Sequence, residues 1–352
     1  MAQLNEDLIR SVFAEMLACK PSLSKYTMVD EDDDEELVDY RILGDQIIKN
    51  FPWPIGVELR RLFSGSMRQL DRLRLDQIFK TIERAMQFIT FVMVAQLWND
   101  KKEGKVKIPE SLAKDFESRF AILSMGNFTW LIRMIGNLYT DQKIPWFMEE
   151  IETNFDKKFY AALDFWVPER NEIGHYQINL TQEDIEKRCV EYEEKLGYIL
   201  QQISFLAKYR LVSVREIKVN KPKYKEAHFH HIIELLNSSD SDFAAKEVDE
   251  SRYAESNAVL LLKSIKTFDD YLNLSPLVID TNGEIIDDKE KFSIKKDVFL
   301  FTKFRNDQLM YLGTEVTEKC DLRSLSNYAD LVEEYKELLG EISGKAVGVA
   351  QT

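Results

Sequence analysis

The stretch "YRLVSVREIKV", residues 209–219, decides the fold class, because the spacing of apolar residues changes there. Before this stretch, apolar residues recur every three or four positions, which predicts amphipathic helices. From this stretch onward, they alternate with polar residues or form short runs, which is typical of strands. We therefore predict an α+β protein, with an all-α helical bundle over residues 1–208 and a small α+β domain over residues 209–352.

The helical region divides into segments at its breaks. The sequence "FPWPIG", residues 51–56, separates one helix from the next, because proline suits the first turn of a helix and disfavours its interior. Pro168 is expected to end a later helix for the same reason. The other helices predicted from apolar spacing cover about residues 4–17, 69–98, 109–123, 127–140, 146–166 and 182–208.

The second domain is expected to contain hairpins and a closing helix. Asn282-Gly283 lies between apolar runs and predicts a tight hairpin, since this pair readily adopts the positive φ of a type I′ turn. Arg305-Asn306-Asp307 separates "VFLFTKF" from "QLMYLGTEV" and predicts a second hairpin. Apolar residues at helical spacing predict a helix over about residues 327–342.

The charge of the chain limits how it could contact nucleic acid. The formal net charge is −14, and the run Asp30–Glu36 contributes seven of the negative charges. An acidic surface repels RNA, so any contact needs a local basic patch. Residues 208–225 hold seven Lys or Arg residues, one acid and interleaved tyrosines, and predict such a patch or, alternatively, an exposed strand guarded by lysines. The candidate RNA-binding residues are Lys218, Lys221, Lys223 and Lys225.

Cysteine usage and hydropathy predict a cytoplasmic protein. Cys19, Cys189 and Cys320 are far apart, and their spacing matches neither a redox motif nor a zinc site. The first residues lack the basic and apolar regions of a secretory signal. The uncharged stretch Ala85–Trp98 has 14 residues. It is shorter than the roughly 20 residues that span a bilayer, so a buried helix is expected and no membrane contact.

The stretch "RNEIGH", residues 170–175, is the strongest candidate for chemistry in a chain with no Walker loop, GxGxxG, HExxH or GxSxG motif. His175 could accept the proton of an RNA 2′-hydroxyl or protonate the leaving 5′-oxygen, because imidazole titrates near neutral pH. Arg170 could hold the scissile phosphate with its planar guanidinium. Asn171 could orient either partner by hydrogen bonding.

This hexapeptide resembles the Arg-x4–6-His motif of the HEPN superfamily, including the polar residue after the arginine. The resemblance covers roughly residues 1–208 and implies a helical bundle that forms a homodimer, with two copies of the motif in one cleft. It implies a metal-independent endoribonuclease without a cofactor, acting as a toxin or effector in prokaryotic antiviral or stress defence. The implied partners are an RNA substrate, a second copy of the chain, and an antitoxin or other defence-system protein.

Three alternatives stay open. The first is a catalytically inactive HEPN-like module that serves dimerisation or ligand binding. The second is a metal-dependent hydrolase that uses the cluster His228–His231, in which His228 and His230 would share one face of a strand. In the third, Arg170 and His175 only cap helices and pair with neighbouring carboxylates.

Overall fold

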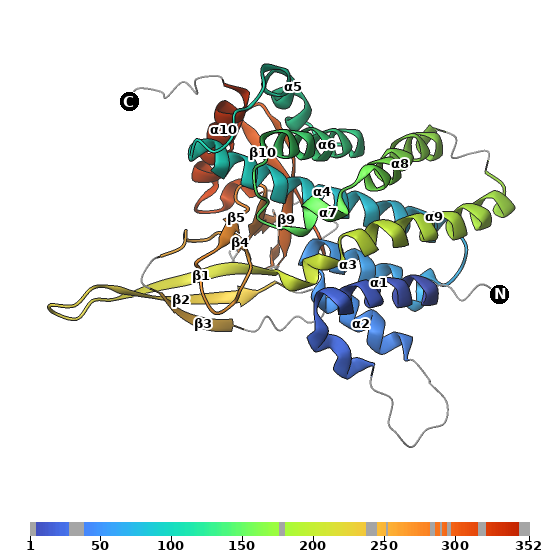
Figure 1. Ribbon diagram of the computed structural model, residues 1–352, viewed down its shortest axis with the longest axis horizontal. Helices are drawn as coiled ribbons and strands as arrows, with labels where there is room; N and C mark the ends of the chain where they lie inside the picture. The colour runs from blue at the N-terminus through green and yellow to red at the C-terminus, as the bar shows by residue number, and fades with distance from the viewer. Residues whose placement is uncertain are drawn as a thin grey trace. The chain divides into compact units, whose positions relative to one another are not determined.

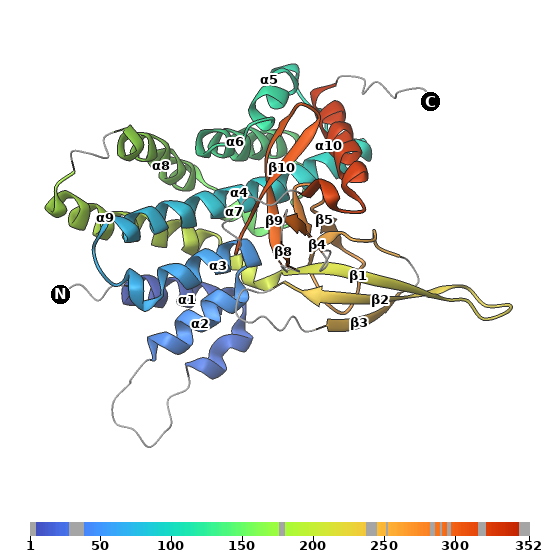
Figure 2. The same cartoon turned by 180° about the vertical axis from the view of Figure 1, so that it is seen from behind.

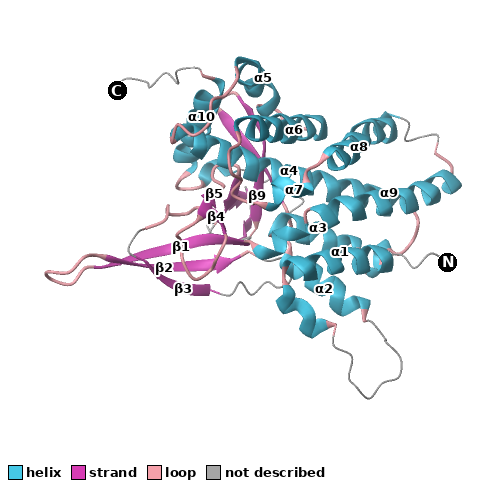
Figure 3. Cartoon of the chain, viewed as in Figure 1, coloured by secondary structure: helices cyan, strands magenta, loops and turns pink. Residues whose placement is uncertain are grey.

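The computed structural model describes residues 5–27, 39–175, 180–236, 245–250, 253–281, 286–288, 291–293, 297–315 and 322–344. Helices come first, antiparallel strands follow and a helix closes the chain, which confirms the predicted α+β class (Figure 3). The acidic run Asp30–Glu36, the pair Asn282-Gly283 and Cys320 lie outside the described residues. Residue contacts group the chain into two compact units: unit 1 is Met1–Met86, Glu150–Tyr209 and Leu236–Phe243, and unit 2 is Gln87–Glu149, Arg210–Leu235 and Ala244–Thr352.

Unit 1 is built from helices. They are α1 (Glu6–Cys19), α2 (Tyr40–Asn50), α3 (Trp53–Leu62), the first half of α4 (Arg72–Lys102), α7 (Glu150–Asn154), α8 (Lys157–His175) and α9 (Gln182–Gln202) (Figure 1). The predicted break between α2 and α3 is confirmed, because Pro52 precedes α3 with extended backbone and Pro54 lies in its first turn. Thr181 and Asp184 form a reciprocal capping box that begins α9.

The core of unit 1 contains a cluster of aromatic side chains. Trp166 of α8 is fully buried. Its ring lies edge to face with Phe79 of α4 and with Tyr192 of α9, at 5.7 Å between ring centroids in each pair. Each such pair stabilises the fold by about 0.5–1.5 kcal/mol beyond the burial of its area. The cluster therefore fixes α8 against α4 and α9.

The helix that carries residues 170–175 differs from the prediction. The predicted helix 146–166 is in fact two helices, α7 and α8, and α8 continues past Pro168 to His175. The expectation that the helix ends at Pro168 is therefore wrong. Proline removes one helical hydrogen bond, but the buried Trp166 anchors the turn before it and a hydrogen bond from Tyr192 to Glu169 anchors the turn after it.

Unit 2 combines helices with antiparallel sheets. Its helices are the second half of α4, α5 (Glu110–Phe120), α6 (Met125–Gln142) and α10 (Tyr328–Ser343). The largest sheet has the strand order β3-β2-β1-β4-β5, formed by β1 (Arg210–Asn220), β2 (His228–Leu235), β3 (Ala245–Glu250), β4 (Val259–Leu262) and β5 (Tyr271–Asn273). A second sheet has the order β10-β9-β6, formed by β6 (Val278–Asp280), β9 (Val298–Arg305) and β10 (Gln308–Gly313), and β7 (Ile286–Asp288) pairs with β8 (Lys291–Ser293).

The two predicted hairpins have different outcomes. β9 and β10 form the expected hairpin, and Asn306 and Asp307 both take positive φ at its turn, as a type I′ turn requires. The hairpin expected at Asn282-Gly283 falls on residues outside the described ranges, so it stays a prediction; within those ranges, β6 pairs with β9 and β7 pairs with β8. β6 is buried along its whole length beside β9, so long-range burial determines its partner.

The contact grouping does not follow the predicted domain boundary throughout. The predicted boundary falls after residue 208, and the contact grouping divides the chain one residue later, between Tyr209 and Arg210, where β1 begins. However, residues 87–149 group with the strands, although their apolar spacing is helical. The predicted domain boundary after residue 208 stays a prediction.

Candidate functional site

Arg170 and Asn171 lie in the last two turns of α8, and both are exposed to solvent. The side chain of Arg170 is 49% exposed, and its Nε lies 3.6 Å from Oε2 of Glu83 on α4. An exposed ion pair at this distance contributes little free energy, of the order of 0–1 kcal/mol. The guanidinium is therefore held loosely and can reach a ligand.

A tighter network holds the backbone on which Arg170 stands. Tyr192 of α9 donates a hydrogen bond to Oε2 of Glu169, and Arg188 donates to Tyr192 over 3.1 Å. Arg188 also pairs with Glu172 over 2.6 Å. Burial raises the pKa of the Tyr192 phenol, and the hydrogen bond to Glu169 raises it further. The residues on either side of Arg170 and Asn171 are thus bound to α9, while those two side chains remain outside the network.

His175 is the last residue of α8. Its backbone is helical, and its side chain lies outside the described part of the structure. On an α-helix, positions 171 and 175 are one turn apart and share a face, whereas position 170 lies about 140° away from position 175. A site that uses all three residues of one chain therefore needs the substrate to bend around the end of the helix, or needs residues from a second copy.

The basic strip of residues 208–225 is divided by its contacts. Lys208 pairs with Glu150. Burial lowers the pKa of Arg210. Arg215 is partly buried between Glu234 and Asp280, the second pair at 3.0 Å. Lys218 pairs with Glu216 over 3.3 Å on the strand surface. The first half of the strip therefore serves the fold of the sheet or pairs with nearby acids.

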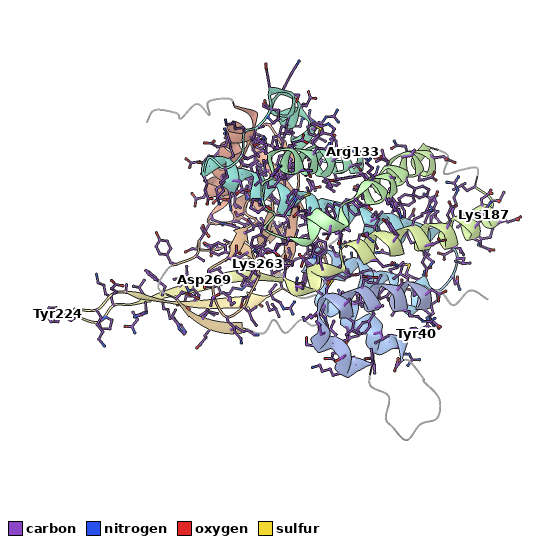
Figure 4. The ribbon with its side chains drawn as sticks, in the orientation of Figure 1. Tyr40, Arg133, Lys187, Tyr224, Lys263 and Asp269 are labelled. Atoms are coloured by element: carbon purple, nitrogen blue, oxygen red, sulfur yellow. The ribbon has the colours of Figure 1, made fainter. Side chains whose placement is uncertain are left out.

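The second half of the strip forms the tip of the β1–β2 hairpin. β4 pairs with β1 only over residues 210–213, so the end of β1 pairs with β2 alone and its side chains are largely exposed. Tyr224 is 94% exposed at the tip (Figure 4), and the Nζ of Lys223 lies 5.0 Å from its ring centre. Both ribbon views show this tip projecting beyond the other strands of unit 2 (Figures 1 and 2). Lys221 and Lys225 are exposed there as well.

The histidines of "HFHH" are not brought together in one site. Nε2 of His230 lies 3.3 Å from Oε2 of Glu247 on the neighbouring strand β3. His228 is exposed near the hairpin tip. His231 is fully buried on the opposite face, where its Nε2 accepts a hydrogen bond from the Ala254 N–H over 3.1 Å. Among the residues that the structure describes, no group of three or more His, Cys, Asp or Glu side chains is placed to hold a metal ion.

Sequence reasoning did not find the residues that support the motif. Glu83, Arg188 and Tyr192 lie far from Arg170 in the chain, and each is one of many charged or aromatic residues on long helices. One signal was available, since Arg188 and Tyr192 are four residues apart and share a face of α9. That spacing shows which residues are neighbours on α9 but gives no indication of the helix that they contact.

No helix in the described ranges is long and apolar enough to cross a membrane. Comparisons with known protein families, with curated proteins and with solved structures found no significant match.

Proposed function

We propose that this chain is a metal-independent endoribonuclease of HEPN type, a toxin or effector in prokaryotic antiviral or stress defence. One observation carries the proposal: Arg170 and Asn171 are consecutive exposed residues near the end of α8, while Glu169 and Glu172 on either side of them are bound to α9. A rigid helix end with exposed polar side chains is what positions a catalytic group on a substrate. The resemblance of "RNEIGH" to the HEPN motif supplies the reaction class.

In the proposed reaction, the 2′-hydroxyl oxygen of RNA attacks the adjacent phosphorus, and the bond from phosphorus to the 5′-oxygen breaks. A histidine accepts the proton of the 2′-hydroxyl, and a protonated histidine donates a proton to the leaving 5′-oxygen. The guanidinium of Arg170 stabilises the charge that develops on the phosphate oxygens. Asn171 orients the phosphate or the imidazole. The products are a 2′,3′-cyclic phosphate and a free 5′-hydroxyl.

A homodimer would supply the second histidine. His175 of one copy cannot act as both base and acid on opposite sides of one phosphate at the same moment. A two-fold axis that joins two α8 ends would place two copies of the motif around one substrate. We therefore propose that the active form is a homodimer that binds RNA, and that an antitoxin or other defence-system protein controls it.

The second candidate function is a non-catalytic module for dimerisation or ligand binding. The observation that favours it is the ion pair between Arg170 and Glu83, because an arginine that is already paired can serve the fold alone. The two functions differ in one measurable property, since only the first requires that RNA be cleaved.

The test is RNA cleavage by the purified full chain in excess EDTA. We expect cleavage that leaves a 2′,3′-cyclic phosphate, and no reaction with DNA, which lacks the attacking hydroxyl. His175→Ala and Arg170→Ala should each lower the rate by about 10²–10⁴-fold, the usual contribution of a positioned proton-transfer or charge-stabilising group. Asn171→Ala should cost less if this residue only orients its partners.

Each variant needs a measurement of stability beside the rate. Arg170 and Asn171 are exposed and His175 is the last residue of α8, so we expect the melting temperatures to stay close to that of the wild type. Glu83→Gln is the matched control, because it frees Arg170 without removing it and should not lower the rate. If no RNA is cleaved with or without EDTA by a sample that light scattering shows to be dimeric, the ribonuclease proposal is wrong and the binding module remains.

A further inference from the structure

A second candidate site lies in unit 1, at the N-terminal ends of α1 and α2. A pocket of about 950 Å³ is bordered by the first turns of α1, by one face of α2 and by residues 60–68 at the end of α3. Tyr40, which lines it at the start of α2, is labelled in Figure 4. Pockets that bind small molecules commonly have volumes of about 300–1,000 Å³, so this one has room for a whole ligand.

One wall of the pocket is apolar. Ile9 and Ile48 are buried, and Phe63 is half-buried beside them. Gly44 keeps this wall open: a Cβ at this position would lie 3.3 Å from Cδ1 of Ile9 and 3.5 Å from Cδ2 of Phe63. An aliphatic or aromatic body would lose contact with water against this wall, which favours its binding.

The charges around the pocket favour an anion. Three acids and three arginines line it, and one of the acids is balanced by a lysine beside the pocket. Asp39 accepts a hydrogen bond from the backbone N–H of Arg41 over 2.8 Å, and Asp45 pairs with Lys49 over 2.7 Å. Arg41 and Arg68 are exposed, and within the described ranges their guanidinium groups form no ion pair. Guanidinium groups bind carboxylate, phosphate and sulfonate oxygens in a bidentate manner.

Hydrogen bonds to Arg74 and Glu193 hold Asn5 in place at the polar end of the pocket. Asn5 is 5% exposed and lines the pocket at the start of α1. Its Oδ1 accepts a hydrogen bond from the fully buried Arg74 over 2.8 Å, and its backbone N–H donates to Glu193 over 2.8 Å. The amide nitrogen of Asn5 has one long hydrogen bond, 3.5 Å to the carbonyl oxygen of Leu62. The side-chain amide of Asn5 therefore still has an N–H that can donate to a ligand, and contacts with α3, α4 and α9 hold Asn5 in position.

We propose that this pocket binds a small organic anion, whose apolar or aromatic body lies against Ile9, Ile48 and Phe63 and whose anionic group is held by Arg41 and Arg68. The proposal does not rest on ribonuclease activity. Two sources share this chemistry, a nucleotide with an aromatic body and a fatty carboxylate with an aliphatic body. The pocket would allow the chain to respond to such a molecule.

The test uses 8-anilinonaphthalene-1-sulfonate, a fluorescent probe with an aromatic body and one anionic group. We expect saturable binding of one probe per folded full-length chain. Arg41→Ala and Arg68→Ala should each weaken the binding by about tenfold, because a hydrogen-bonded charge pair is lost. Arg305→Ala, which removes an exposed arginine of β9, is the matched control and should leave the affinity unchanged.

Competition identifies the source of the ligand. Displacement of the probe by AMP supports a nucleotide, and displacement by decanoate supports a fatty carboxylate. If inorganic phosphate displaces the probe as well as AMP does, the apolar wall has no role and the proposal is wrong. It is also wrong if neither compound displaces the probe, or if both arginine variants bind the probe as the wild type does while circular dichroism shows them folded.

Discussion

At the scale of single residues, Arg170 and Arg74 show how burial decides whether an arginine can bind a ligand or serves only the fold. Arg74 is fully buried and is bound to Met67, Asn5 and Glu193. A charge in that position is part of the fold, because leaving its partners unpaired would cost several kcal/mol, about 3–5. Arg170 is half exposed, with one partner at 3.6 Å. Only the second can exchange its partner for a phosphate at little cost.

His231 gives a prediction about pH. Burial lowers the pKa of this imidazole below its ordinary value of 6.5. The folded chain therefore favours the neutral form, whereas the unfolded chain binds a proton near pH 6.5. The stabilisation is complete above this value and is lost as the pH falls through the folded-state pKa. We expect the free energy of unfolding to fall more steeply in wild type than in His231→Gln between about pH 7.5 and about pH 5.5.

Glutamine is the substitution of choice because its amide oxygen can accept the hydrogen bond that the Ala254 N–H now donates to Nε2. Urea unfolding at each pH measures the difference. His228→Gln is the matched control, since it makes the same substitution at an exposed position of the same strand. Parallel loss of stability in wild type and His231→Gln would show that the buried imidazole does not titrate in this range.

At the scale of elements, the β1–β2 hairpin is the best-defined candidate surface for RNA. Its tip carries Lys221, Lys223 and Lys225 beside the exposed ring of Tyr224, and a base can stack on such a ring. We expect the triple change of these lysines to alanine to weaken binding of an uncleavable 2′-O-methyl RNA. The slope of the logarithm of the binding constant against the logarithm of the salt concentration should become shallower by about 2. Each phosphate contact on a single strand contributes roughly 0.7 to this slope, and three lysines are removed.

The matched control removes three exposed lysines elsewhere in unit 2, namely Lys107, Lys114 and Lys143. Both triple variants change the net charge equally, so only a specific contact can separate them. Equal salt slopes in the two variants would mean that the hairpin lysines act only as guards of an exposed strand.

Helices were easier to predict than strand partners. The apolar spacing located α1, α4, α5, α6 and α10 to within a few residues and α9 at its start, because a helix satisfies its backbone hydrogen bonds locally. Strand pairing depends on distant residues: β6 pairs with β9, and the strands β7 and β8 lie between them in the sequence. β3, β5 and β8 were not predicted, since "AKEVDE", "YLN" and "KFS" are short and carry little alternation.

The residue types of the candidate site come from the sequence alone, and their surroundings come from the structure. The sequence alone indicated Arg170, Asn171 and His175, but it suggested a helix junction where the structure has the last turns of one helix. Pro168 explains the difference. Proline disfavours the interior of a helix, so the sequence alone predicts that the helix ends there. The contacts of Trp166 and Glu169 with Tyr192 of α9 keep the helix intact.

At the scale of the whole molecule, the second half of α4 shows why period alone does not define a domain. Its residues have helical spacing, like those of unit 1, yet the Gln87 side chain donates a hydrogen bond to the carbonyl oxygen of Phe301 in β9 over 2.8 Å. The chain after α5 also contacts β9, where the Leu123 N–H donates to Thr302 and the Phe304 N–H donates to Ala121. Helices and strands of unit 2 therefore share one core.

A truncation after residue 208 tests this division. It would remove β9 and α10 and expose the fully buried ring of Phe120, which now stacks on Tyr335 at 6.0 Å between ring centroids. Exposing one such ring costs about 1.5–3 kcal/mol. Phe116 and Leu112 of the same helix are buried in the same core, part of which the truncation removes. Because a domain has only about 5–15 kcal/mol of stability, we expect the fragment 1–208 to aggregate where the full chain stays dispersed.

Size-exclusion chromatography and urea unfolding of the fragment and of the full chain measure this difference. A monodisperse fragment with the unfolding midpoint of the full chain would instead support the boundary that the change of period predicts near residue 210.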